Sequence, residues 1–134
     1  MRRLLLLAVA LSGLLVLPVL AAQSVSIRLV HATNQSAPST SGVEDVASVL
    51  SRTFPFNHFR VLASASQRLP ANGASSLDGY SVSCSGPQGA LKITVRRGGR
   101  ELVNTTVGLQ DGKPLVLGEL PCDSGRMFLV FVAR

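Results

Sequence analysis

The sequence has few of the side chains that bind nucleic acids. Its 134 residues include no tryptophan, one tyrosine, two histidines and two cysteines, and only 15% of them are charged. Proteins that bind nucleic acids usually show a basic stripe or face, often with aromatic side chains for stacking. The chain has no such stripe and few aromatic residues, so we do not expect nucleic acid as a partner.

Motifs for catalysis and metal binding are also missing. The chain has no Gly-x-Ser-x-Gly nucleophile elbow and no Cys-x-x-Cys pair. The two histidines, His31 and His58, lack the third ligand and the fixed spacing of a zinc site. Several of the acidic residues stand beside glycine or serine, as turn residues do. We therefore expect no enzymatic activity, no metal and no cofactor.

One long hydrophobic run stands at the N-terminus. Two arginines precede an uncharged stretch from Leu4 to Ala22, which Pro18 interrupts shortly before the small residues Ala21 and Ala22. This order is typical of a secretory signal peptide, so residues 1–22 are predicted to be removed and the protein to be periplasmic or secreted. The same run is long enough to span a bilayer, and contact with a membrane is expected only if it is retained as an anchor.

The remaining residues, 23–134, are enough for one exported domain and too few for two. These residues carry 11 basic and 7 acidic side chains, since the other two basic residues of the chain, Arg2 and Arg3, belong to the predicted signal peptide. This mild positive charge favours solubility and weak attraction to anionic surfaces, but it specifies no partner.

Alternating hydrophobicity predicts a domain made mainly of strands. Residues 24–32 alternate, and so do several segments after Phe59, with turn signals such as Gly98-Gly99 and residues 70–73 between them. A single helix is predicted from Ser41 to Phe54, with Glu44 at capping-box spacing and Pro55 as the stop. The predicted class is α+β, predominantly antiparallel β: a single meander sheet, a sandwich or a small barrel with one covering helix.

The last strand, residues 126–134, is apolar on both faces. We therefore predict that it lies at the centre of a sheet or is covered on both sides. Cys84 and Cys122 are predicted to form one disulfide, because an even pair of cysteines in a small exported domain usually does.

Two surfaces are candidate binding sites. Arg96, Arg97 and Arg100 flank the predicted Gly98-Gly99 turn, where they would form an anion-binding hairpin tip or simply a solvated tip that resists aggregation. Phe56 and His58 lie in an aromatic cluster between the helix and the next strand. They would form a docking patch for a protein, or else belong to the packing between helix and sheet.

The segment Asp111–Gly118, which follows a strand rich in threonine and valine, resembles a turn found late in the bacterial secretins. The secretins are the outer-membrane channels of secretion and pilus systems, and this chain is too short to be one of them. What the resemblance implies is an accessory role in an envelope assembly.

We therefore expect a non-catalytic exported interaction module with a protein partner in the cell envelope. Two alternatives stay open at this point. A carrier of a small hydrophobic ligand would need an apolar cavity. A protein inhibitor would present a rigid loop near residues 70–73 or 86–89.

Overall fold

The computed structural model describes residues 23–134. The predicted signal peptide and its alternative, a retained anchor, lie outside these residues. Between residues 23 and 134, no helix has both the length and the hydrophobicity needed to cross a membrane.

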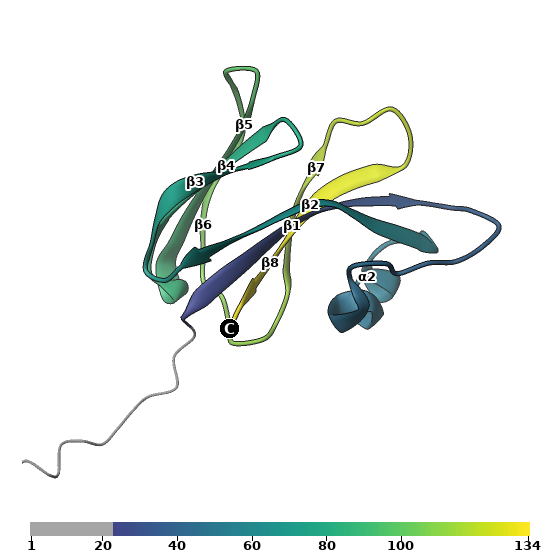
Figure 1. Ribbon diagram of the computed structural model, residues 1–134, viewed down its shortest axis with the longest axis horizontal. Coiled ribbons are helices and arrows are strands. Elements are labelled where there is room, and N and C mark those ends of the chain that lie inside the picture. The colour runs from purple at the N-terminus through teal and green to yellow at the C-terminus, as the bar shows by residue number, and fades with distance from the viewer. Residues whose placement is uncertain (1–22) are drawn as a thin grey trace, which may run out of the picture.

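The described chain folds into two four-stranded antiparallel sheets, which are not closed into a barrel (Figure 1). The strand order of the first sheet is β2-β1-β8-β7, and that of the second is β3-β4-β5-β6. The first sheet contains β1 (Ser24–Thr33), β2 (His58–Arg68), β7 (Leu115–Leu120) and β8 (Arg126–Ala133). The second contains β3 (Ala71–Leu77), β4 (Tyr80–Gly86), β5 (Leu91–Arg97) and β6 (Arg100–Val107).

The prediction of a mostly antiparallel β protein with one helix is confirmed, but the helical segment begins at Glu44 and not at Ser41. The strands form neither a single meander sheet nor a small barrel, so these two alternatives were wrong. Residues 70–73 were predicted to be a turn, but β3 already begins at Ala71. Only Ala71 and Leu77 of this strand are buried, and small or polar residues lie between them. The strand was missed because such a segment carries no alternating hydrophobic signal.

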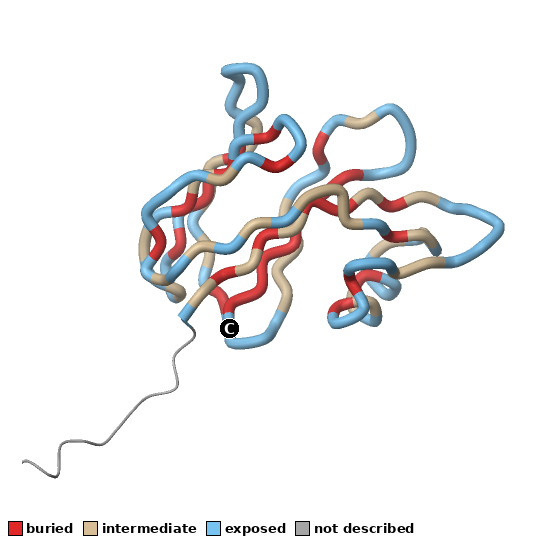
Figure 2. The backbone as a smooth tube through the Cα atoms, in the orientation of Figure 1, coloured by how far each residue is buried: buried red, intermediate tan, exposed pale blue. Residues whose placement is uncertain are grey.

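Strand β8 lies in the middle of the first sheet, between β1 and β7, and all its residues after Arg126 are buried (Figure 2). One face, including Leu129 and Phe131, packs into the core that the two sheets share. The opposite face, including Phe128 and Val130, packs into a second cluster with the helical segment. The prediction of a central strand covered on both sides is confirmed.

A bulge in β2 changes which side chains face the second sheet. The register with β1 shifts between Leu29 and Val30, so that Leu62 has no direct partner there. Before the bulge, Phe59 packs on the helix side of the first sheet; after it, Ala63 packs against the core between the sheets. The regular alternation predicted from Phe59 to Ala65 therefore breaks at this point, because a bulge adds one residue to one strand only.

The helical segment covers the outer face of the first sheet (Figure 1). It consists of a 3-10 turn, η1 (Glu44–Val46), followed by α2 (Ala47–Thr53), and it buries Val46 and Leu50. It ends before Phe54 and Pro55, as predicted. The predicted capping box does not form, since no side chain caps the N-terminus of either helix.

Asp45 joins this segment to the sheet through two arginines. Its carboxylate accepts two hydrogen bonds from Arg28 on β1, at 2.7 and 2.8 Å, and one from Arg134 at 2.8 Å. The Arg28 hydrogen bonds, supported by those from Arg134, hold the pKa of the Asp45 carboxyl well below its usual range. The ionised carboxylate is thus favoured in the folded protein.

Asp45→Asn should lower the free energy of unfolding by about 1–2 kcal/mol at pH 7, because a partly exposed multiple ion pair is worth about that much. A group whose pKa falls on folding stabilises at pH values above its unfolded pKa and loses that contribution as the pH drops. The difference between wild type and variant should therefore shrink progressively below about pH 4. Urea unfolding of both proteins at several pH values measures this difference in the free energy of unfolding.

The matched control is Asp78→Asn, since the structure shows no ion pair for Asp78, an exposed turn residue. This substitution should have little effect at any pH. A cost for Asp45→Asn that stays constant from pH 7 to pH 2.5 would contradict the assigned role of the carboxylate.

Candidate functional site

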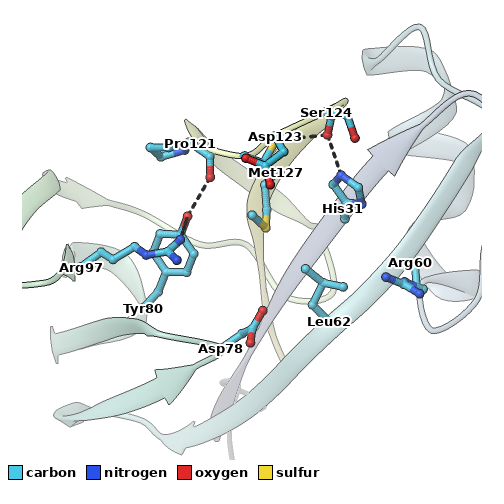
Figure 3. A pocket seen from close by; sticks show the side chains of 11 residues that line it. His31, Arg60, Leu62, Asp78, Tyr80, Arg97, Pro121, Asp123, Ser124 and Met127 are labelled. Carbon is cyan, nitrogen blue, oxygen red and sulfur yellow. Dashed lines mark hydrogen bonds between the residues drawn. The ribbon is translucent and has the colours of Figure 1, made fainter.

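An open cleft of about 660 Å³ lies at one end of the two sheets (Figure 3). It forms where β1, β4 and β5 reach the same end as the loop between β7 and β8. Side chains from both sheets line it: His31, Arg60, Leu62, Asp78, Tyr80, Arg97, Pro121, Cys122, Asp123, Ser124 and Met127.

Arg97 is held in position on one wall of the cleft. Its guanidinium carbon lies 4.7 Å from the centre of the Tyr80 ring, and Nη1 donates a hydrogen bond of 2.9 Å to the Tyr80 hydroxyl. That hydroxyl in turn donates to the Pro121 carbonyl at 3.0 Å (Figure 3). Tyr80 is almost completely buried, so it links the end of β5 to the loop before β8 and orients the guanidinium.

Four charged side chains line the cleft without an ion-pair partner in residues 23–134. They are Arg60, Arg97, Asp78 and Asp123. Here charges of both signs face one concavity and remain available to a ligand.

His31 and Cys122 meet at one carbonyl group in the cleft. His31 Nε2 lies 2.7 Å from the Ser124 carbonyl oxygen, and Cys122 Sγ donates to the same oxygen at 3.3 Å. The position of His31 follows from its parity, because it continues the inward-facing row of Val25, Ile27 and Leu29 on β1.

The prediction of a disulfide is wrong: Cys84 and Cys122 are both free thiols. Cys84 lies on β4 in the core between the sheets, paired in register with Gly73 and Ile93. Burial raises the pKa of its thiol to about 11. Cys122 lies in the loop before β8, where its sulfur donates to the carbonyls of Ser124 and Gly125. Counting cysteines could not predict this, since a bridge needs two side chains directed at each other.

The three arginines of the predicted hairpin tip differ in their partners. Gly98 and Gly99 form the turn with positive φ angles, as predicted. Arg96, however, forms an ion pair with Glu101 at 3.2 Å, and Arg97 turns to Tyr80. Of the three, Arg100 alone has no hydrogen bond or ion pair among those that the described chain shows.

The predicted docking patch is partly used in packing. Phe54 stacks on Phe128 with ring centres 4.4 Å apart, and Phe59 is fully buried. Phe56 is half-buried against the same cluster, and the Arg126 guanidinium lies 5.9 Å from its ring centre. His58 is half-buried at the start of β2, and its Nδ1 has no hydrogen-bond partner in the described part of the chain. The two residues therefore offer a small surface beside the helix.

His31 and Cys122 do not form a nucleophile–base pair in the cleft. Neither His31 nor Cys122 is hydrogen-bonded to the other, and each is bonded to a main-chain carbonyl instead. A nucleophile and its base normally lie within hydrogen-bond reach of each other. Within residues 23–134, no group of three or more His, Cys, Asp or Glu side chains is placed to hold a metal ion.

Sequence reasoning missed this cleft, although it singled out Arg97. Asp78 and Asp123 stand beside glycine or serine, as turn residues do, and no motif marks Tyr80. A tyrosine next to an Asp-Gly turn is an ordinary sequence feature. Only the packing of the second sheet against the first brings these residues to one place.

Comparisons with protein-family models, with curated proteins and with solved structures found no match for this chain.

Proposed function

We propose that the protein is a non-catalytic exported interaction module that binds a segment of an envelope protein in the cleft between its two sheets. The observation that carries the proposal is the set of four charged side chains, two positive and two negative, that line the cleft without partners of their own. A partner segment with charges of both signs would be complementary to it.

The positioning of Arg97 supports a binding role. The Tyr80 hydroxyl and ring fix its guanidinium before any ligand arrives, so less side-chain entropy is lost on binding. The remaining N–H groups of the guanidinium are suited to a carboxylate, which takes two parallel hydrogen bonds.

The two alternatives have less support. A hydrophobic-ligand carrier needs an apolar cavity, whereas charged side chains surround this cleft. The inhibitor alternative keeps only its second candidate loop, residues 86–89, because most of residues 70–73 belongs to β3. The accessory role in an envelope assembly therefore remains the role that we propose.

Site-specific photo-crosslinking in the native envelope tests the proposal. A photoreactive residue at Ser124 in the cleft, which leaves the four charged side chains in place, should capture a specific protein, whereas the same residue at Lys92, an exposed position on β5, should not. Mass spectrometry identifies the captured protein and its crosslinked peptide.

Charge reversal then tests the cleft itself. Arg60→Glu and Arg97→Glu should each weaken binding of the captured partner about tenfold, as expected for the loss of a charged contact. Arg100→Glu is the matched control, since it makes the same charge change just outside the cleft. Equal capture from Ser124 and Lys92, or equal weakening by all three reversals, would contradict the proposal.

A further inference from the structure

Three side chains with donor atoms suited to copper line the same cleft. His31 on β1 and Met127 on β8 are directly opposite in the register of the first sheet, and both line the cleft. Side chains opposite each other in an antiparallel pair have Cβ atoms about 4.5–5.5 Å apart. Cys122 comes from the loop immediately before β8. In Figure 3 the Met127 side chain extends into the cleft between Tyr80 and Leu62.

The histidine and the cysteine already share one hydrogen-bond partner. His31 Nε2 is 2.7 Å from the Ser124 carbonyl oxygen and Cys122 Sγ is 3.3 Å from it, so the two donor atoms lie at most the sum of these distances apart, 6.0 Å. A metal ion that replaces the carbonyl as their common partner would draw them together. Because Cys122 is a free thiol on a loop, its sulfur is available for this.

The combination of donors selects the metal. Thiolate and thioether sulfur are soft ligands that favour Cu(I), and imidazole also binds copper. Ca²⁺ and Mg²⁺ need oxygen donors, and structural zinc sites take cysteine and histidine rather than methionine. Met127 is the only methionine in the described chain, and it lines the same cleft as the other two donors.

We propose that His31, Cys122 and Met127 form a binding site for a single Cu(I) ion. Binding releases the Cys122 thiol proton to solvent and involves no change in the oxidation state of copper. The proposal goes beyond the proposed interaction role and does not depend on it.

The test is anaerobic competition for Cu(I) between the purified full-chain protein and the chromophoric chelator bicinchoninate. The protein should take up one equivalent of Cu(I). Cys122→Ser, His31→Gln and Met127→Leu should each weaken binding at least tenfold, with unchanged circular dichroism as the check on folding. Met127→Leu conserves volume in this nearly buried position, so a fold defect is not expected from it.

The chain supplies its own matched controls. Cys84→Ala and His58→Gln remove the other thiol and the other imidazole of the described chain, and both should leave Cu(I) affinity unchanged. X-ray absorption of the loaded protein should show sulfur and nitrogen ligands together. Failure to compete for Cu(I), equal loss in the controls, or full affinity in Met127→Leu would each overturn the proposal. Partner capture by the metal-free protein is measured separately, so either proposal can fail alone.

Discussion

Replacing Phe128 by alanine is expected to lower the free energy of unfolding by about 3–5 kcal/mol, as is usual when a buried phenylalanine is truncated. The side chain is fully buried at the centre of the first sheet, opposite Val30. Its ring stacks on Phe54 with an interplanar angle of 10°, which links the sheet to the end of the helical segment. Urea unfolding followed by circular dichroism measures the loss.

Phe56→Ala is the matched control, because Phe56 is only half-buried and lies at the edge of the same cluster. It should cost about 1 kcal/mol, in proportion to the smaller area that it buries. The double variant Phe54→Ala/Phe128→Ala should lose less free energy of unfolding than the two single variants lose in sum. The reason is that either single substitution already removes the stacking between the two rings. A cost below about 1.5 kcal/mol for Phe128→Ala would mean that the helical segment does not enclose this ring.

Gly125→Ala is expected to lower the free energy of unfolding by about 2–4 kcal/mol and to weaken binding in the cleft. Gly125 has a φ of +70°, and a Cβ added there would overlap the carbonyl oxygen of Ala32 on β1. The loop before β8 would have to move away from β1. Because Ser124 precedes this glycine, the carbonyl that contacts His31 and Cys122 would move with it.

Gly112→Ala separates the steric effect from the backbone effect. Gly112 has a similar φ of +73°, but an added Cβ would meet nothing within 4 Å. This substitution should cost only the strain of a positive φ, about 1 kcal/mol, and should leave the cleft unchanged. Thermal unfolding of both variants, together with partner capture, distinguishes the two effects. Equal costs for the two glycines would contradict the close approach of Gly125 to β1.

The parts of the fold that could be predicted from sequence are those with a strong local signal. The alternation around Ile93 on β5, the Gly98-Gly99 turn and the doubly apolar β8 are all found as expected. The helix end before Pro55 also follows from a local steric rule. In each case neighbouring residues decide the conformation, so no knowledge of distant contacts is needed.

The predictions that were wrong concern features that depend on contacts between residues far apart in the sequence. β3 is a strand because β4 pairs with it along its whole length, although its own residues are small and polar. The bulge at Leu62 moves the side chains that follow it to the other face of β2, and the local alternation of the sequence does not indicate it. The predicted disulfide fails because Cys84 and Cys122 have separate surroundings, one in the core and one in a loop.

The sequence by itself determined that this is a chain of antiparallel strands with one short helix and a buried last strand, because hydrophobic periodicity and turn residues act over a few positions. Only the tertiary structure decided that the strands divide into two sheets and that Arg97 turns to Tyr80 instead of joining Arg96 at the hairpin tip. It also placed His31, Cys122 and Met127 around one cleft. The physical reason is that long-range pairing and packing, which bring together residues up to about a hundred positions apart, leave little trace in local sequence patterns.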